Sequence, residues 1–353
     1  MIPVASSLLR RGHTVYIGSG EEIANFFRSE IDGLKYIHFP GFTIRYSSWL
    51  PQYIKIALSI PSFLYRTRKE HIGLQKLIRQ YSIDIVISDS RLGLWNRDVR
   101  TAFVTHMMRV PFPRYLRFLE NSGKPFLKKL FSRFDYCFIP DLPDEPNLAG
   151  KLSHVNETPH NVRYIGILSR FSNDESDASG SQYRYFCTVI LSGPEPQRSI
   201  LKRKLALVLK RYDGRCLFLE GKPGSTREII NEDNLEFVSH LPAAEMKKTL
   251  QESRYIVSRS GYTTIMELVS IRKSALLIAT PGQSEQEYLA LLMSERGWFG
   301  SVAQSEIDNW SGLTPVEPLW PASINRESSR LLENALDELL EQEHESGRNE
   351  KSG

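Results

Sequence analysis

A short turn in the second half of the chain has the residue types that bind a phosphate group. The turn, Arg259-Ser260-Gly261-Tyr262-Thr263-Thr264, lies between an apolar strand-like segment and a run typical of a helix. A glycine turn at a helix start presents backbone N–H groups and the positive end of the helix dipole. Thr263 and Thr264 add hydroxyl groups that donate to an anion or cap the helix. The turn therefore predicts a diphosphate site, with an ordinary capped helix start as the alternative.

Glu267 lies about one turn into the same predicted helix. A carboxylate there can accept hydrogen bonds from two vicinal hydroxyl groups, such as the 2′ and 3′ hydroxyls of a ribose. The alternative is a carboxylate that only complements the helix dipole. Together with the turn, Glu267 indicates half of a nucleotide-binding site.

A second polar loop follows the predicted strand at residues 275–278. Its side chains with hydrogen-bonding groups are Gln283, Glu285, Gln286 and Glu287. Ligands of α/β sheets bind at the carboxyl ends of parallel strands, so this loop is expected to face the same ligand as the turn. Amide and carboxylate groups without a metal-ligand pattern suit a sugar with many hydroxyl groups.

Two side chains in the first half of the chain can take up a proton. Asp89 ends the apolar run at residues 83–88, and His106 ends the run at 101–105. Both follow predicted parallel strands, and burial can tune the pKa of either group. We therefore expect Asp89 or His106 to act as a general base. The alternatives are a helix cap or an ion pair with Arg91 for Asp89, and a structural role for His106.

The elements that must position these groups alternate along the chain. Strands are predicted at residues 14–18, 35–39, 83–88, 101–105, 136–140, 189–191, 216–219, 235–238, 255–258 and 275–278, and the apolar segment at 163–168 leads out of the first domain. Helices are predicted at residues 59–81, 115–134, 199–210 and 325–343. This order predicts an α/β protein with parallel sheets in two Rossmann-like domains, residues 1–160 and 161–322, followed by a C-terminal helix and tail at 323–353.

The composition narrows the class of protein. The chain has 353 residues and 41% hydrophobic content, as soluble globular proteins have. Its three cysteines, Cys137, Cys187 and Cys216, lie far apart, which argues against a disulfide framework or zinc knuckle and for a reducing compartment. We find no apolar run long enough to span a membrane and no signal peptide pattern.

The charge is divided unequally. Residues 1–150 carry a net charge of +8 and the remainder carries −4. Residues 109–133 interleave seven basic residues with phenylalanines and a tyrosine, against one acid, Glu120. Such a mixture predicts peripheral contact with an anionic membrane, and no nucleic-acid motif accompanies it. A basic helix that packs its aromatic residues into the core is the alternative.

The segment from Ser258 to Glu267, followed by Pro281-Gly282-Gln283 and Gln286, resembles the C-terminal half of family-28 glycosyltransferases of the GT-B fold. The best-known members of this family are the N-acetylglucosamine transferases of peptidoglycan synthesis, which act on a muramoyl-pentapeptide lipid. The resemblance is clearest over residues 189–297. It implies two domains facing a central crevice and a UDP-sugar donor, carrying N-acetylglucosamine or a related hexose.

The resemblance also implies residue roles. The residue matching Glu267 holds the ribose, those matching Gln286 and Glu287 contact the donor sugar, and the turn from Ser260 to Thr263 lies against the diphosphate. Ser192 and Gly193 match a loop that approaches the donor. In this chain two prolines replace the glycines of that loop and remove N–H donors, so Arg198 is a candidate for the missing charge. Residues 241–250 match an element whose backbone reads uracil.

No Asp-x-Asp metal signature is found, so we expect inverting transfer without a metal or other cofactor. The acceptor can be a soluble sugar, a lipid-linked sugar or a glycolipid, reached at the cytoplasmic face of a membrane. The family's first strand and glycine-rich loop would precede Ile2, which suggests a late start or a specialised copy. A nucleotide-sugar epimerase or hydrolase and a non-catalytic binding subunit remain as alternative functions.

Overall fold

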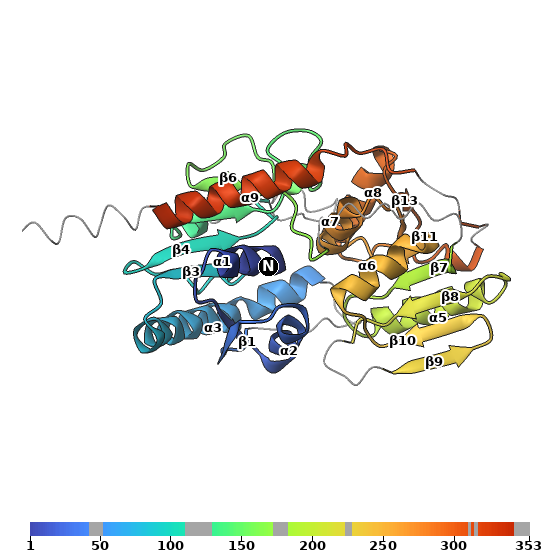
Figure 1. Ribbon diagram of the computed structural model, residues 1–353, viewed down its shortest axis with the longest axis horizontal. Coiled ribbons are helices and arrows are strands. Elements are labelled where there is room, and N and C mark those ends of the chain that lie inside the picture. Colours follow the sequence, from blue (N-terminus) through green and yellow to red (C-terminus); the bar gives the residue numbers. More distant parts are fainter. Residues whose placement is uncertain are drawn as a thin grey trace, which may run out of the picture. The chain divides into compact units, whose positions relative to one another are not determined.

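The computed structural model describes residues 1–41, 52–109, 129–171, 183–222, 228–309, 312–313 and 317–341 (Figure 1). The chain divides into two compact units. Unit 1 contains Met1 and the described residues between 55 and 168 and from 323 onward. Unit 2 contains those between 2 and 54 and between 169 and 322.

Unit 2 is built around a seven-stranded sheet in the order β13-β12-β11-β7-β8-β10-β9. Its strands are β7 (Tyr185–Ile190), β8 (Cys216–Leu219), β9 (Ile229–Glu232), β10 (Leu235–Val238), β11 (Ser253–Ser258), β12 (Leu276–Leu277) and β13 (Gly300–Ser301). Neighbouring strands are parallel, except that β9 is antiparallel to β10. Val189, Phe218 and Val257 are fully buried, as parallel strands covered on both faces require.

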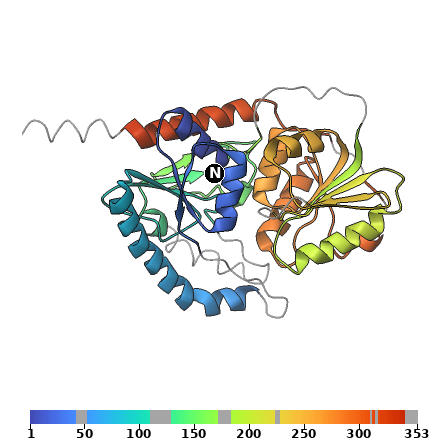
Figure 2. The same ribbon diagram turned by 60° about the horizontal axis from the view of Figure 1, so that its bottom comes forward.

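Helices of unit 2 connect these strands. They are α5 (Gln197–Leu209), α6 (Ala243–Gln251), α7 (Tyr262–Ser270) and α8 (Ser284–Glu295), with the short helix η3 (Ile307–Asn309) after β13. Helix α5 covers one face of the sheet, where Leu201 and Leu205 are buried in one cluster with Val189 and Phe218 (Figure 2). The sheet and its helices thus fix the carboxyl ends of the strands at one edge.

The first part of unit 2 comes from the beginning of the chain. It consists of α1 (Ile2–Arg10), β1 (Tyr16–Ser19), α2 (Glu21–Glu30) and β2 (Lys35–His38). Strands β1 and β2 form a two-stranded parallel sheet of their own. Gly12 has a φ of +85°, the left-handed conformation that closes a helix, and α1 ends two residues before it.

Unit 1 contains a four-stranded parallel sheet in chain order. Its strands are β3 (Ile85–Asp89), β4 (Arg100–Val104), β5 (Tyr136–Ile139) and β6 (Val162–Tyr164). Its helices are α3 (Gln52–Tyr81), which begins three residues before the unit, the short η2 (Gly150–Leu152) and α9 (Ile324–Glu341). Phe103, Phe134 and Cys137 are buried together in its core. In the described ranges, no helix is both long enough and apolar enough to cross a bilayer.

Helix α9 belongs to unit 1 although unit 2 precedes it in the sequence. Gly166 has a φ of +69°, and a Cβ built there would lie 2.2 Å from the Cα of Ser328, so only glycine permits this approach. The N–H of Ile167 donates to Ser328 Oγ at 3.0 Å. The buried face of α9 consists of Ile324, Ser328, Leu332, Ala335, Leu336 and Leu339. These contacts hold the chain in unit 1 as far as Leu168.

The predicted α/β class with parallel sheets agrees with the structure, but the division of the chain differs. The chain passes from unit 1 to unit 2 after Leu168, whereas the predicted boundary lies between residues 160 and 161. Residues 2–54 belong to unit 2, and α9 packs on β6 of unit 1 instead of forming a separate part. Periodicity gives the order of elements, whereas long-range contacts decide which unit each joins. Strands β9 and β13 were not predicted, because both are short and one is fully exposed.

Candidate functional site

Three loops of unit 2 meet at one edge of its sheet. They follow β7, β11 and β12, which are neighbouring parallel strands and therefore end at the same edge. A Cβ built on Gly193 would lie 3.8 Å from Thr280 Oγ1, which shows how closely two of these loops approach. The structure thus brings together the loop of Ser192 and Gly193, the turn at 259–261 and the loop at 279–283.

A buried arginine joins the three loops. Nη1 of Arg259 donates to the carbonyl oxygens of Ile278 (3.3 Å) and Ala279 (3.0 Å), and Nη2 donates to the carbonyl oxygen of Gln197 (2.9 Å). The residue is fully buried. Burial lowers the pKa of its guanidinium to about 10, so the group is still charged at neutral pH. We predicted Arg259 to bind substrate, and its donors here hold the loops that surround the expected ligand.

The turn continues into the amino end of α7. Gly261 has an extended backbone (φ −73°, ψ 138°) and precedes Tyr262, the first residue of the helix. Ser260 is buried, and its Oγ donates to the carbonyl oxygen of Gln286 at 2.7 Å. The side chain of Thr263 is exposed and that of Thr264 is half-buried. The predicted geometry of a glycine turn opening a helix is therefore present, with hydroxyl groups at its surface.

The loop before α8 is held by the polar side chains that the sequence singled out. Gln286 Oε1 accepts from the N–H of Thr280 at 2.9 Å, and Glu287 Oε1 accepts from the N–H of Gly282 at 3.0 Å. Gln283 precedes the first residue of α8 and is half-buried. These bonds fix the loop, and the predicted contact of Gln286 and Glu287 with a sugar stays a prediction.

Glu267 forms an ion pair that the sequence analysis did not foresee. Its Oε1 lies 2.9 Å from Nε of Arg170, and its side chain is only 10% exposed. Arg170 also lies 3.5 Å from Glu30 of α2, through Nη1. Burial raises the pKa of Glu267, and Arg170 opposes this shift by stabilising the carboxylate. Two buried acids therefore share one arginine beside α7.

Sequence separation explains why Arg170 and Glu30 were missed. Arg170 comes two residues after the segment at 163–168 that leads out of the first domain, and this position at the domain exit was the one available signal. Glu30 ends an exposed, charged helix and accepts from the N–H of Ala243, 213 residues away. Periodic patterns in the sequence predict local structure and do not predict a contact between residues so far apart in the chain.

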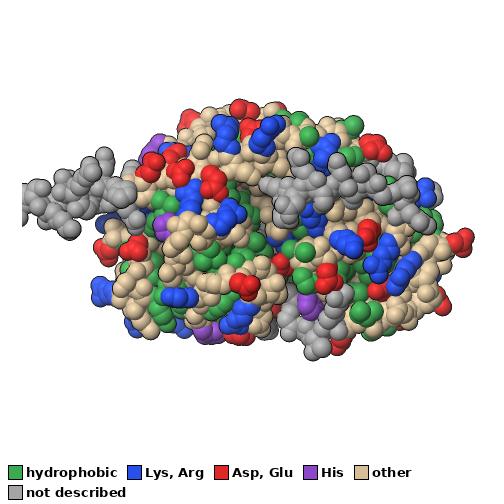
Figure 3. Space-filling view, viewed as in Figure 1, with side chains coloured by type: hydrophobic (Ala, Val, Ile, Leu, Met, Phe, Trp, Pro, Cys, Tyr) green, Lys and Arg blue, Asp and Glu red, His purple; other side chains and the backbone are tan. Residues whose placement is uncertain are grey.

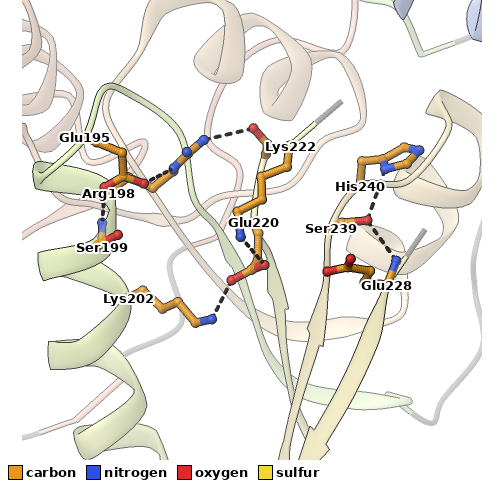
Figure 4. A network of polar contacts seen from close by, with 10 residues as sticks. Glu195, Arg198, Ser199, Lys202, Glu220, Lys222, Glu228, Ser239 and His240 are labelled. Atoms are coloured by element: carbon orange, nitrogen blue, oxygen red, sulfur yellow. Dashed lines mark hydrogen bonds and ion pairs between the residues drawn. The ribbon is translucent and has the colours of Figure 1, made fainter. Parts of the chain in front are cut away.

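Arg198 is engaged locally near the loop that follows β7. Figure 4 shows its guanidinium between Glu195 and the end of β8; Nε lies 3.0 Å from Glu195 Oε1, and Nη1 donates to the carbonyl oxygen of Gly221 at 3.1 Å. The hydrogen bond from Ser199 lowers the pKa of Glu195; burial opposes this shift, and a weaker contribution from Arg198 adds to the lowering. Arg198 is thus an anchor of this loop, and its proposed role as a phosphate ligand stays a prediction.

A second ion-pair cluster lies beside it. Lys202 of α5 and Lys222 both contact the carboxylate of Glu220, at 2.5 Å and 2.9 Å (Figure 4). Burial raises the pKa of Glu220, but the two lysines outweigh it and the pKa is lowered overall. The three charges form one surface network next to the loop after β7.

The two predicted bases lie in unit 1. Asp89 is the last residue of β3 and is exposed, and its register partner on β4 is Val104, two residues before His106. Both residues therefore lie at the carboxyl edge of the four-stranded sheet. Arg91 pairs with Glu70 of α3 at 3.0 Å, and Ser90 Oγ donates to Asp89 Oδ1 at 3.3 Å, so the role of Asp89 stays a prediction.

The predicted membrane segment at 109–133 lies mostly outside the described residues. Of its described part, Leu130 and Phe131 are buried, and Phe131 packs 5.9 Å from Phe103 between ring centroids. Phe131 is therefore a core residue rather than a surface one, because its ring completes the cluster under the sheet. Among the described residues, no three His, Cys, Asp or Glu side chains gather as metal ligands do.

Comparison with known sequences finds a similarity to one protein family in part of unit 2. Residues 224–309 match the Glycosyltransferase family 28 C-terminal domain. A protein of Methanosarcina acetivorans, called an uncharacterized glycosyltransferase, is 25% identical over 250 residues, and one of Methanosarcina mazei with the same name is 25% identical over 240 residues. The matches cover 64% and 63% of this chain but only 62% and 61% of the relatives' own length.

Comparison with solved structures gives the fold. The glycosyltransferase SnogD from Streptomyces nogalater is 13% identical and has a TM-score of 0.58, over 95% of this chain and 91% of its own. The spinosyn rhamnosyltransferase SpnG, complexed with thymidine diphosphate, is 11% identical with a TM-score of 0.57, over 95% and 92%. At this identity the likeness establishes the fold alone. The chain has the α/β fold of GT-B glycosyltransferases, as predicted.

The role of Arg259 can be tested by replacing it with lysine. Lysine keeps a charge but cannot reach three carbonyl oxygens, so Arg259→Lys should lower the free energy of unfolding by about 3 kcal/mol. Urea unfolding measures this loss. Arg254→Lys, at an exposed position on β11, the strand that precedes Arg259, is the matched control. Equal stability of the two variants would contradict the proposed joining of the loops.

Proposed function

We propose that this chain is a glycosyltransferase that uses a nucleoside-diphosphate sugar. The observation that carries the proposal is the position of Glu267, a buried carboxylate on the helix that opens at the three-loop edge. Its Oε1 lies 2.9 Å from Nε of Arg170, which stabilises the ionised carboxylate. An ionised carboxylate has two acceptor oxygens, as binding the vicinal hydroxyl groups of a ribose requires.

The diphosphate of this donor would lie against the amino end of α7. The turn of Ser260 and Gly261 and the hydroxyl group of Thr263 border that end, and the helix dipole favours a negative charge there. The same groups would stabilise the departing diphosphate during transfer without a metal. Loop residues Gln283, Gln286 and Glu287 would bind the hydroxyl groups of the sugar, which we propose to be N-acetylglucosamine or a related hexose on UDP.

The acceptor would be activated by a group of unit 1. Inverting transfer requires a base that removes the proton of the acceptor hydroxyl as its oxygen attacks the anomeric carbon and the diphosphate leaves. Asp89 and His106 follow adjacent parallel strands, so either can serve an acceptor bound at that edge. The exposure of Asp89 would let an acceptor reach its carboxylate directly.

We further propose that the acceptor is reached at the cytoplasmic face of an anionic membrane. Where the exposure of α3 side chains is described, at residue 62 and from 64 to 81, the exposed large apolar ones are Leu64, Tyr65 and Ile72. Its exposed basic residues are Arg66, Arg68, Lys69, Lys76 and Arg79. Lys and Arg side chains are visible at the lower left of Figure 3, in the part where Figure 1 draws α3.

The spacing on α3 supports one continuous surface. Tyr65, Arg68, Ile72, Lys76 and Arg79 follow one another at helical intervals, so apolar and basic side chains alternate along one face. The helix has one acid, Glu70, which is paired with Arg91. Apolar side chains that enter the interface and cations that meet lipid phosphates are the two features of interfacial helices.

The free thiols of the three buried cysteines agree with a reducing compartment.

The ribose role predicts the effect of removing Glu267. Glu267→Ala should weaken UDP binding by about 1.5–3 kcal/mol, because charged hydrogen bonds to the ribose are lost. Isothermal titration calorimetry measures the affinity, and Glu295→Ala, an exposed acid at the end of α8, is the control. Unchanged UDP affinity in Glu267→Ala would rule out the ribose role.

The base can be identified by separating binding from turnover. Alanine in place of the true base, Asp89 or His106, should lower kcat by about 100-fold or more while UDP affinity stays the same. A donor-hydrolysis and transfer assay across UDP-sugars, run with EDTA, provides the rates. A variant with full turnover removes its residue from consideration, and loss of wild-type activity in EDTA contradicts the metal-free mechanism.

The membrane role predicts a charge-dependent affinity. The variant Arg68→Glu/Lys69→Glu/Lys76→Glu should bind vesicles about 100-fold more weakly, since each basic residue contributes about 1 kcal/mol near an anionic surface. Sedimentation with phosphatidylcholine vesicles containing roughly one third phosphatidylglycerol measures the difference. Arg203→Glu/Arg211→Glu/Arg254→Glu reverses three exposed cations of unit 2 as the control. Equal binding of the two triple variants would exclude α3.

A further inference from the structure

A chain of polar contacts in unit 2 leads from the amino end of α6 to Glu267. The N–H of Ala243 donates to both carboxylate oxygens of Glu30, at 3.2 Å each. Glu30 Oε1 lies 3.5 Å from Nη1 of Arg170, whose Nε lies 2.9 Å from Glu267 Oε1. All four residues belong to the same unit. Each group therefore has its position fixed by the one before it.

The chain is buried along its whole length. The side chains of Glu30, Arg170 and Glu267 are 6%, 16% and 10% exposed. A buried charge is costly unless it is paired, so none of the three can leave its partner without a large penalty. The helix dipole of α6 favours the negative charge of Glu30 at its amino end. Glu30 is thus the residue that anchors Arg170 from the side opposite Glu267.

Arg170 is also held by packing. Its guanidinium carbon lies 5.6 Å from the ring centroids of both Phe26 and Phe171, and Nη2 lies 2.7 Å from Met246 Sδ. Phe26 and Glu30 are one turn apart on α2, so a single helix supplies a ring and a carboxylate to the same guanidinium. A flexible arginine held at this many points has one orientation, and so does the carboxylate that it pairs.

We propose that Glu30, acting through Arg170, is a positioning residue that orients the Glu267 carboxylate for the ribose of the donor. The inference rests on the proposed function, because it gives the ribose as the ligand of Glu267. It adds that a residue from the first thirty of the chain controls how the nucleotide half-site reads its ligand. In this proposal Arg170 holds Oε1, so that the carboxylate presents Oε2 to the ribose in one orientation.

A thermodynamic cycle, in which both the protein and the ligand are changed, tests the positioning role of Glu30. UDP and 2′,3′-dideoxyuridine diphosphate are titrated calorimetrically into the wild-type chain, Glu30→Gln and Glu22→Gln. Glutamine keeps the shape of Glu30 and can still accept from Ala243, but it loses the charge that anchors Arg170. Glu22 is an exposed acid of the same helix and serves as the matched control. Urea unfolding of each variant reports whether it is folded.

The expected result is a loss of discrimination rather than a uniform loss of binding. The wild-type chain and Glu22→Gln should prefer UDP over the dideoxy ligand by about 10-fold or more, and Glu30→Gln by less than about 3-fold. A purely structural role of Glu30 would weaken both ligands equally and leave the preference unchanged, which would overturn the inference. Tighter UDP binding by Glu30→Gln would overturn it as well.

The same data separate this inference from the proposed function. If the wild-type chain binds no UDP, or binds both ligands equally, the ribose role of Glu267 fails and the role of Glu30 fails with it. If the wild-type chain discriminates and Glu30→Gln discriminates equally, only the positioning role is wrong. Arg170→Lys, which keeps a charge without the guanidinium fork, should lose discrimination like Glu30→Gln; retention of the wild-type preference would also overturn the inference.

Discussion

Arg259 carries a positive charge into the interior of unit 2 and uses it to bind three carbonyl oxygens. The loops that follow β7, β11 and β12 would otherwise present unpaired carbonyl groups at a crowded edge, and an unpaired buried acceptor is costly. One guanidinium satisfies acceptors from two of these loops and is itself part of the third. The polar loop before α8 and the amino end of α7 owe their mutual position to this contact, and any ligand at the edge depends on it.

Buried charge is the second organising feature of unit 2, and Arg259 and Arg170 are stabilised in different ways. In the described part of the chain Arg259 pairs with carbonyl oxygens and not with a carboxylate, and burial lowers its pKa to about 10. Arg170 instead lies between two acids, Glu30 and Glu267, whose pKa values burial raises and Arg170 opposes. Arg259 holds loops together by binding their carbonyl oxygens, whereas Arg170 orients the carboxylate of Glu267. The proposed donor site would use both, since a mobile or protonated carboxylate would bind a ribose weakly.

The acceptor side has a simpler basis. Asp89 and His106 follow adjacent strands of the four-stranded sheet because parallel pairing places Asp89 opposite Val104. Helix α9 returns to that sheet through the close approach of Gly166 to Ser328, so unit 1 is completed by the last described part of the chain. The basic and apolar face of α3 lies on the same unit. The base candidates and the proposed membrane surface therefore share one folded body, as transfer to a lipid-linked acceptor would need.

The sequence by itself determined the local structure of this protein. Apolar runs buried in parallel strands, the glycine turn at 259–261 and the helix that carries Glu267 were predictable, because strand burial, helix capping and helical periodicity are properties of neighbouring residues. The tertiary structure alone decided that Arg259 points inward to carbonyl groups, that Phe131 is a core residue, that residues 2–54 join unit 2, and that Glu30 and Arg170 reach Glu267. Each of these depends on contacts between residues far apart in the chain. Such contacts are chosen by packing and by the cost of burying an unpaired charge, and neither leaves a periodic trace in the sequence.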